Sequence, residues 1–385
     1  MKKLTKVTSI VLATAMTVAC LAGCGGNTSS ADTFKIGGIG PITGGAAVYG
    51  QAVMNGAQIA VDEINAAGGI NGHKIEYKFE DDEHDAEKSV NAYNSLMDWK
   101  MQILMGTVTS GPCIAVVDKT NADHVFQLTP SGTAPEAIAH DNAFRVCFSD
   151  PNQGTASAKY IGEHGLAKKV GIIYDSSDSY SSGITENFKN EAANQGIEVV
   201  SSEAFTADTK SDFSTHLQAA VDGGAELIFL PFYYSEASLV LTQAAQKDIN
   251  VKFFGCDGLD GILALDGFDK SLAEGVMLLT PFSATSDDPQ TKAFVDKYQE
   301  KYNEVPNQFA ADAYDAIYII KMAAEKANIT PSMTNEEICN ALMSAMTSIK
   351  YTGITGSDIS WGADGEPNKA PIVVEIVNGE YSILK

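Results

Sequence analysis

Hydroxyl-bearing residues at the ends of predicted strands are the first candidates for chemistry. Ser110 stands between a strand predicted to end at Gly106 and a helix predicted to open near Pro112, a residue favoured in the first helical turn. A carboxylate at this place would meet free backbone N–H groups and the positive end of the helix dipole. Ser131 and Thr133 follow the next predicted strand, so we expect them at the same sheet edge. By composition alone they can equally be turn formers.

Signatures of catalysis are missing from the sequence. It contains no GxSxG, HExxH, P-loop or CxxC pattern, which mark common nucleophilic, zinc and phosphate-transfer sites. Gly38, Gly40 and Gly44 follow a strand and precede a helix, as in a dinucleotide site, but their spacing differs and Pro41 lies among them. We interpret these glycines as a tight strand-to-helix turn. A Rossmann-like enzyme is therefore the least favoured class, and we expect no catalysis and no cofactor.

An acidic run around His84 superficially resembles a metal site. The histidine stands between Asp81, Asp82 and Glu83 on one side and Asp85 on the other. Adjacent residues cannot all converge on one ion. We therefore predict a solvated loop after a strand, and no metal.

Short apolar runs rich in β-formers alternate with amphipathic segments through most of the chain. This alternation predicts parallel βαβ units. Residues 34–39, 75–80 and 102–106 are the first predicted strands, and the pattern is repeated in strands at 170–174, 197–205, 227–232 and 251–255. We therefore predict an α/β fold of two similar Rossmann-like lobes with parallel sheets, joined by hinge crossovers.

Polar segments that contain proline, at residues 149–153 and 283–289, are predicted to cross between the lobes. A chain of this length exceeds what one core usually serves. The expected first lobe comprises residues 34–150 and 281–350, and the second comprises residues 151–280 and 351–385. The chain is predicted to end in two short strands that are joined by an Asn378-Gly379 turn.

The N-terminus has the pattern of an export signal. Lysines at positions 2, 3 and 6 precede an apolar run that closes on Leu21-Ala22-Gly23-Cys24, the small-residue pattern of a bacterial lipoprotein. We expect residues 1–23 to be cleaved, Cys24 to be acylated, and residues 24–33 to form a flexible tether. The alternative is an ordinary signal peptide with a chance cysteine.

Net charge limits the classes of partner, and the number of cysteines limits the disulfide content. Loss of the leader, with three lysines and no acids, takes the formal net charge from −23 to −26, which argues against nucleic acid and favours a soluble monomer. Beyond Cys20 in the leader and Cys24 at the expected acylation site, four cysteines remain, too few for a disulfide framework: Cys113, Cys147, Cys256 and Cys339.

Several motifs taken together resemble the branched-chain amino acid binding proteins of ABC importers, the type I periplasmic binding proteins. They are GPITG at 40–44, EINAAGGING at 63–72, DD at 81–82, TPSGT at 129–133, FR at 144–145, the turn from 174 to 180, and WGADG at 361–365. The resemblance runs nearly from residue 34 to the C-terminus, and it implies a ligand cleft at the carboxyl ends of the strands of both lobes.

The resemblance also implies a set of binding residues. In that family a serine and a threonine hold the ligand carboxylate, and they match Ser110 and Thr133; a main-chain carbonyl at Ser131 accepts from the ammonium group. A tyrosine matching Tyr180 and an acid matching Asp257 come from the second lobe, and the acid would pair with the ammonium.

The same resemblance implies aromatic pocket walls and identifies the places where some relatives carry a disulfide. Tyr49 and Tyr233 match aromatic pocket walls, although Tyr234 adjoins the second of these. Some relatives carry a first-lobe disulfide whose places correspond here to His84 and Thr109. Whether Cys113 and Cys147 form a substitute is left open.

The function implied is capture of an amino acid, with leucine, isoleucine or valine the best fit, for delivery to the permease of an ABC importer. The protein would be anchored by lipid at the outer face of the bacterial cytoplasmic membrane, or lie in the periplasm. The alternative is an extracytoplasmic sensor for another amino acid, a small amide or an aromatic acid, because relatives of similar sequence bind such ligands.

Overall fold

The structure is a computed structural model that describes residues 33–384. The predicted leader, the Cys24 anchor and residues 24–32 of the predicted tether lie outside the described residues. Thr33, predicted as the last residue of the tether, is instead the first residue of a strand. Within the described range, none of the helices combines the length and the apolar character needed to cross a bilayer.

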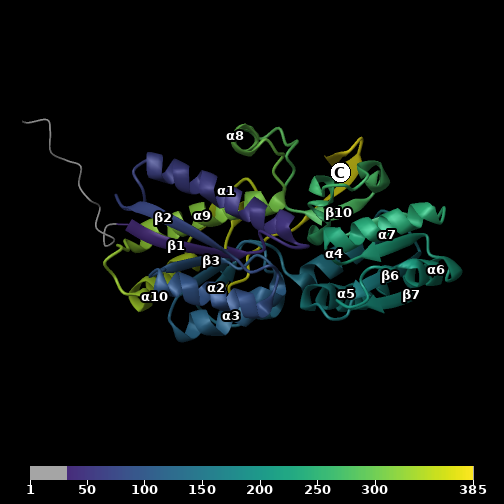
Figure 1. The fold of residues 1–385 in the computed structure, drawn as a ribbon, viewed down its shortest axis with the longest axis horizontal. Coiled ribbons are helices and arrows are strands. Elements are labelled where there is room, and N and C mark those ends of the chain that lie inside the picture. Colours follow the sequence, from purple (N-terminus) through teal and green to yellow (C-terminus); the bar gives the residue numbers. More distant parts are fainter. Residues whose placement is uncertain (1–32, 385) are drawn as a thin grey trace, which may run out of the picture.

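A five-stranded parallel sheet forms the centre of the first lobe (Figure 1). Its order is β2-β1-β3-β4-β5, and all four neighbouring pairs are parallel. The strands are β1 (Thr33–Gly40), β2 (Lys74–Asp81), β3 (Ile103–Gly106), β4 (Phe126–Thr129) and β5 (Ala143–Arg145). Strands β3 and β4 are buried at every position, as expected of a parallel sheet covered on both faces.

A seven-stranded sheet forms the second lobe, in the order β14-β13-β10-β9-β8-β6-β7. Its strands are β6 (Lys169–Asp175), β7 (Glu198–Phe205), β8 (Leu227–Leu230), β9 (Lys252–Gly255), β10 (Met277–Thr280), β13 (Ile372–Val377) and β14 (Glu380–Ile383). The last two run antiparallel and form the predicted C-terminal hairpin. The fold class is therefore confirmed as two α/β lobes with mainly parallel sheets.

Helices cover both faces of each sheet. The helices are α1 (Ala47–Ala66), α2 (Ala86–Asp98), α3 (Ser110–Ala122), α4 (Asp150–Glu163), α5 (Ser179–Ala192), α6 (Ser214–Asp222), α7 (Tyr234–Gln246), α8 (Pro289–Tyr302), α9 (Gln308–Ala327) and α10 (Asn335–Met346). In Figure 1, α1 lies above the first sheet and α2 and α3 lie below it. In the second lobe α4 packs on α5, and α6 packs on α7.

The connections between the lobes differ in part from the predicted segments. Residues 150–153 were expected to be part of a crossing, but they form the first turn of α4, where Pro151 is tolerated because its missing N–H is not needed. The connection therefore ends at Ser149. Residues 283–288 do form a connection, since α8 begins only at Pro289. The chain returns to the second sheet at β13, after the hairpin of β11 (Tyr351–Gly353) and β12 (Gly356–Ile359).

Close packing of α1 against α9 supports one side of the cleft. The predicted apolar face of α1, which includes Val53, Ala57 and Val61, is buried. Gly56 allows the two helices to approach, because a Cβ added there would lie 2.0 Å from the carbonyl oxygen of Ala310.

We predict that Gly56→Ala destabilises the chain by about 2 kcal/mol or more, because backbone atoms of α9 cannot yield to the added methyl group without moving the helix. Urea unfolding would measure the change. Gly111→Ala is the matched control, since a Cβ added to this helical glycine would meet no heavy atom within 4 Å and alanine favours the helix. Equal stabilities of the two variants would contradict the prediction.

Candidate ligand-binding site

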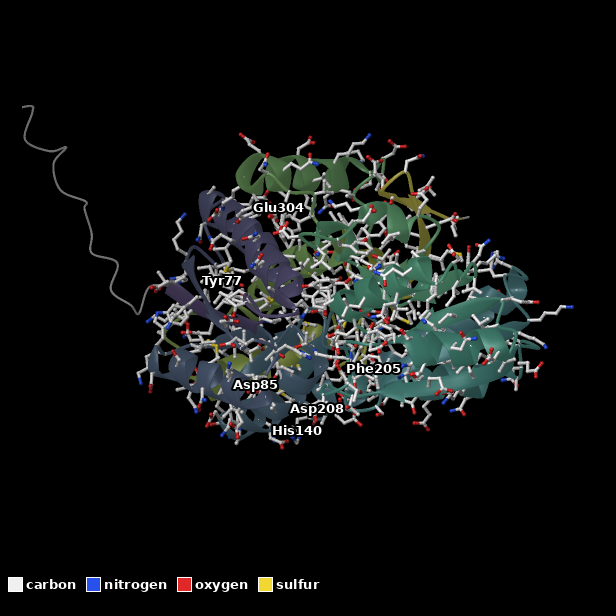
Figure 2. All side chains as sticks on the ribbon, turned by 45° about the vertical axis from the view of Figure 1, so that its right-hand side comes forward. Tyr77, Asp85, His140, Phe205, Asp208 and Glu304 are labelled. Atoms are coloured by element: carbon white, nitrogen blue, oxygen red, sulfur yellow. The ribbon has the colours of Figure 1, made fainter. Side chains whose placement is uncertain are left out.

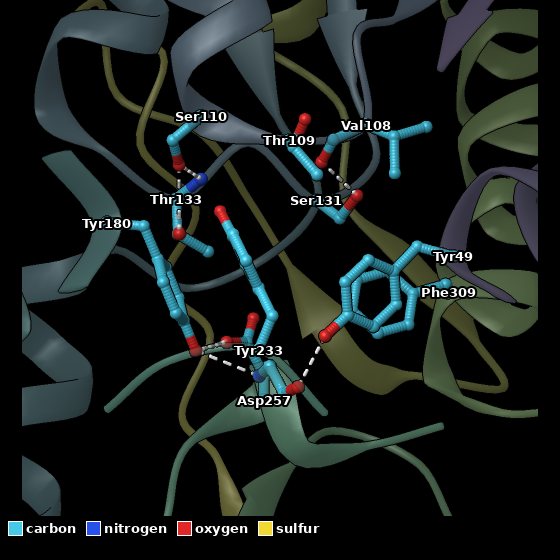
Figure 3. Close-up of a pocket in the computed structure, with 11 residues that line it drawn as sticks. Tyr49, Val108, Thr109, Ser110, Ser131, Thr133, Tyr180, Tyr233, Asp257 and Phe309 are labelled. Atoms are coloured by element: carbon cyan, nitrogen blue, oxygen red, sulfur yellow. Dashed lines mark hydrogen bonds between the residues drawn. The ribbon is translucent and has the colours of Figure 1, made fainter. Parts of the chain in front are cut away.

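The seven residues singled out in the sequence meet in one pocket between the lobes (Figure 3). The pocket is lined by Tyr49, Val108, Thr109, Ser110, Ser131, Thr133, Tyr180, Tyr233, Asp257, Gly258 and Phe309. The first lobe contributes its hydroxyl groups from the ends of β3 and β4, and the second contributes Tyr180, Tyr233 and Asp257. Residues that are more than 200 positions apart in the sequence thus line the same pocket.

Ser110 and Thr133 lie together at the first-lobe side of the pocket. Their hydroxyl oxygens are 3.4 Å apart. Ser110 is the first residue of α3, so the helix begins two residues before Pro112, near which it was predicted to open. The Ser110 hydroxyl oxygen accepts hydrogen bonds from the backbone N–H of Thr133 at 3.3 Å and of Ala134 at 3.2 Å. This corner therefore gathers hydroxyl and N–H donors, the groups that a carboxylate needs.

Ser131 lines the pocket, and its hydroxyl proton is used within the first lobe. Its hydroxyl donates to the carbonyl oxygen of Val108 at 2.7 Å. The hydroxyl therefore has no proton left to donate to a ligand, and the contact that the family resemblance implies at this position is through the main-chain carbonyl.

Asp257 is the charged group on the second-lobe side, and the protein holds it in one orientation. It begins a short 3-10 helix after β9 and is 4 % exposed. The Tyr180 hydroxyl donates to its Oδ1 at 2.7 Å and accepts from the N–H of Gly258 at 2.8 Å. The backbone of Asp257 is fixed by the side chains of Gln153 and Gln308.

Burial raises the pKa of the Asp257 carboxyl to about 7, against the opposing effect of hydrogen bonds from Tyr180 and Gln153; the nearby Asp312 raises the pKa further. Among residues 33–384, no lysine, arginine or histidine forms an ion pair with Asp257. A cationic group brought into the pocket would supply that missing partner.

Tyr49 joins the two lobes across the pocket. It belongs to α1, yet its hydroxyl donates to the carbonyl oxygen of Gly258 and accepts from the N–H of Tyr234 at 3.2 Å. Its ring lies 4.2 Å from that of Phe309, centroid to centroid. Burial raises the pKa of Tyr49 well above its usual value, so it remains a neutral hydroxyl. Tyr49 is thus both an aromatic wall and an interlobe contact.

Tyr233 separates this pocket from a larger chamber. Its ring stacks on Tyr180 at 4.9 Å and meets the ring of His84 edge-on at 5.2 Å. His84 Nδ1 and the Thr109 hydroxyl are 2.9 Å apart, so a hydrogen bond joins the two places that correspond to the disulfide of relatives. Cys113 and Cys147 are both buried free thiols.

The inner pocket is nearly filled by its own side chains. Its cavity is about 10 Å³, about the space of one water molecule. A chamber of about 460 Å³ adjoins it beyond Tyr233 and His84, and Phe205, which lies near the boundary of the lobes in Figure 2, lines this chamber. The structure therefore shows the lobes closed on each other, and a solute of amino-acid size would need them to separate.

Phe309, Val108 and Thr109 line the pocket without having been singled out as ligand contacts. Phe309 lies at the start of α9 and reaches the pocket because α9 packs along α1. An apolar residue in a helix is predicted to be core in any case, so the sequence carried no signal for this role.

Comparison with known proteins agrees with the fold. A family model described as periplasmic binding protein matches residues 33–380. A leucine-, isoleucine-, valine-, threonine- and alanine-binding protein of Pseudomonas aeruginosa is 31% identical over 88% of this chain and 89% of its own length. A Leu/Ile/Val-binding protein of Rhizobium johnstonii is 31% identical over 86% and 88% of the two chains.

Solved structures show the same architecture. The branched-chain amino acid transporter substrate-binding protein LivJ of Streptococcus pneumoniae, in complex with isoleucine, has a TM-score of 0.83 at 31% identity, covering 92% of this chain and 99% of its own. A solute-binding protein of R. palustris in complex with benzoate has a TM-score of 0.81 at 21% identity, covering 91% and 95%; at that identity the likeness concerns the fold alone.

The two lobes and the cleft between them define a solute-binding protein. The chain belongs to the periplasmic binding protein family, among the type I proteins related to Leu/Ile/Val-binding proteins. Members of this family are extracytoplasmic binding proteins and not enzymes.

The raised pKa of Asp257 predicts a pH dependence of stability. The folded-state value of about 7 lies above the value of about 3.9 that holds when the chain is unfolded. The folded chain therefore binds more protons between these pH values, and its stability falls as pH rises through this window. We predict that Asp257→Asn removes this loss, so that the ligand-free variant exceeds the parent by about 2 kcal/mol or more at pH 8 and by little at pH 4.

Urea unfolding of both chains across this pH range would measure the effect. Asp141→Asn, at an exposed position, is the control. A stability difference between Asp257→Asn and the parent that does not change with pH would contradict the assignment.

Proposed function

We propose that this protein captures a free α-amino acid between its lobes and delivers it to the permease of an ABC importer. The observation that carries the proposal is that one pocket has a buried Asp257 carboxyl without a cationic partner on one side and the donor-rich corner at Ser110 and Thr133 on the other. A zwitterion removed from water needs both an anionic partner and hydrogen-bond donors. The ammonium would pair with Asp257 and with the carbonyl of Ser131.

The side chain of the ligand would be aliphatic. Tyr49, Tyr233, Phe309 and Val108 supply aromatic and apolar surface, and burying an aliphatic side chain there would contribute roughly 2 kcal/mol. Leucine, isoleucine and valine fit such walls best. The names of the relatives at 31% identity, which include leucine, isoleucine and valine, support this choice.

Capture would proceed by opening and closing of the lobes. Opening must break the bonds from Tyr49 to Gly258 and from Val48 to Tyr234, which join the lobes. Closure around an amino acid adds contacts from the ligand to both lobes, so the ligand favours the closed form. The closed form is the one that the permease would recognise.

A thermal-shift screen of the chain from residue 25, against the twenty amino acids, small amides and aromatic carboxylates, tests the proposal. We expect leucine, isoleucine and valine to raise the unfolding temperature, because a ligand that binds only the folded chain stabilises it. A response to aromatic acids or amides alone would overturn the amino-acid assignment.

Two variants sharpen this test by calorimetric titration. Asp257→Asn should weaken binding of the responding amino acid by about 2 kcal/mol or more, since the buried ammonium loses its counter-charge. Ser131→Ala should bind nearly as well as the parent, because the hydroxyl of Ser131 faces Val108 and the proposed contact is its carbonyl. Equal losses in the two variants would remove Asp257 from its proposed role.

We also propose that the protein is anchored by lipid at Cys24 on the outer face of the bacterial cytoplasmic membrane; the alternative is a location in the periplasm. Replacing Cys24 with Ala should leave the chain in the soluble fraction of its natural host, because no acyl chain can be attached. Fractionation of cells followed by immunoblotting would measure the distribution. Unchanged membrane association of the Cys24→Ala chain would disprove the anchor.

A further inference from the structure

Arg145 is the only arginine in the 385 residues, and it is fully buried. It lies at the end of β5, directly before the first connection between the lobes. Two motifs that the binding site leaves without a role, FR at 144–145 and WGADG at 361–365, meet at this residue. A buried guanidinium is costly unless its N–H groups find acceptors, so the identity of those acceptors is informative.

The guanidinium clamps the loop that carries the donor-rich corner. Nη1 donates to the carbonyl oxygens of Gly132, at 3.0 Å, and Thr133, and Nη2 donates to that of Ala134 at 2.9 Å. In a trans peptide the N–H points opposite to the C=O of the same unit. Holding the carbonyls of Gly132 and Thr133 therefore directs the N–H groups of Thr133 and Ala134 the other way, onto the Ser110 hydroxyl.

The same residue is bound on its other side by the connection that returns to the second lobe. The indole N–H of Trp361 donates to the carbonyl oxygen of Arg145 at 2.7 Å, and the N–H of Arg145 donates to that of Gly365 at 3.2 Å. Nη2 of Arg145 also lies 3.3 Å from a carboxylate oxygen of Glu366. Backbone and side chain of one residue thus join residues 132–134 to residues 361–366.

Lysine could not replace this clamp. A planar guanidinium presents five donors in a rigid fork, whereas an ammonium is a compact charge on a flexible stem. Three backbone carbonyls and one carboxylate surround this fork, and every other basic residue of the chain beyond histidine is a lysine.

We propose that Arg145 is the positioning residue of the ligand pocket. It orients the N–H groups of residues 133 and 134 toward the donor-rich corner. It also links this corner to the connection at residues 361–366, so that the binding of a ligand in the pocket is transmitted to that connection. The first part concerns the protein alone, and the second rests on the proposed amino-acid function.

Hydrogen exchange of the ligand-free full-length chain tests whether Arg145 links residues 132–134 to residues 361–366. In Arg145→Lys, we expect amides of residues 131–136 and of residues 360–367 both to exchange at least about fivefold faster than in the parent. Ile338→Val, a buried change in α10, at the end of the first lobe away from the second, is the control for general destabilisation. Acceleration confined to one of the two segments, or equal in the control, overturns the proposal.

Tryptophan fluorescence tests whether ligand binding in the pocket is transmitted to the connection at residues 361–366. Trp361 is buried, and Trp99 is the only other tryptophan, so Trp99→Phe leaves Trp361 as the sole emitter. Saturation with the amino acid that responds in the thermal-shift screen should change the Trp361 emission. Adding Arg145→Lys should abolish most of that change and weaken binding about tenfold or more, while adding Ile338→Val should alter neither.

If Arg145→Lys does not fold, Glu366→Gln is the second variant for both measurements. It keeps the shape of residue 366 but removes the charge beside Nη2, and it should accelerate exchange in both segments and reduce the Trp361 response to a smaller degree. Binding with unchanged affinity and full Trp361 response in Arg145→Lys or Glu366→Gln overturns the proposal. Failure of every amino acid to bind the parent chain would instead refute the proposed function, and the exchange experiment would then decide the role of Arg145 alone.

Discussion

The carboxylate of Asp257 lies where the two lobes meet, out of water and without a cationic partner among the described residues. An ionised group in such a place requires compensation, and the surrounding structure supplies only part of it, through Tyr180 and the backbone-fixing glutamines. The remaining electrostatic demand can be met by a ligand ammonium group. A lobe that holds this acid is therefore stabilised most when it closes on a cationic solute, which links binding to closure.

The first lobe offers the opposite polarity across the same pocket. Its hydroxyl groups and the opening turn of α3 present donors, and the buried charge of Arg145 stands behind the loop that carries them. The first-lobe side of the pocket thus favours an anionic group and the second-lobe side favours a cationic group. This arrangement of charge matches a zwitterion in one orientation. In the proposed complex neither lobe alone would contact both ends of the head group, so its binding would depend on both lobes together.

Tyr49 shows how the aromatic walls serve the closed form as well as the ligand. Its hydroxyl bridges from α1 to Gly258 and Tyr234, while its ring packs on Phe309. In the proposed complex the walls would set side-chain preference by shape, and the polar groups would hold the amino-acid head.

Much of the fold could be predicted from the sequence, because the alternation of strand and helix patterns is local and each parallel strand is a short apolar run. The helical face of α1 at Val53, Ala57 and Val61 followed from spacing alone. The first connection was predicted to extend too far, since Pro151 is compatible with a helix start as well as with a loop. Composition by itself left Ser131 and Thr133 as possible turn formers, and only the family motifs singled out Tyr49, Tyr180 and Asp257.

Tertiary structure alone decided which distant residues share one environment. Burial of Asp257 and the pKa that follows from it, the entry of Phe309 into the pocket, and the meeting of Arg145 with Trp361 and Glu366 depend on how two sheets and several connections pack. These are properties of contacts between residues far apart in the chain. A one-dimensional pattern records residue type and periodicity, but the loss of water around a charge is determined only when the whole chain has closed around it.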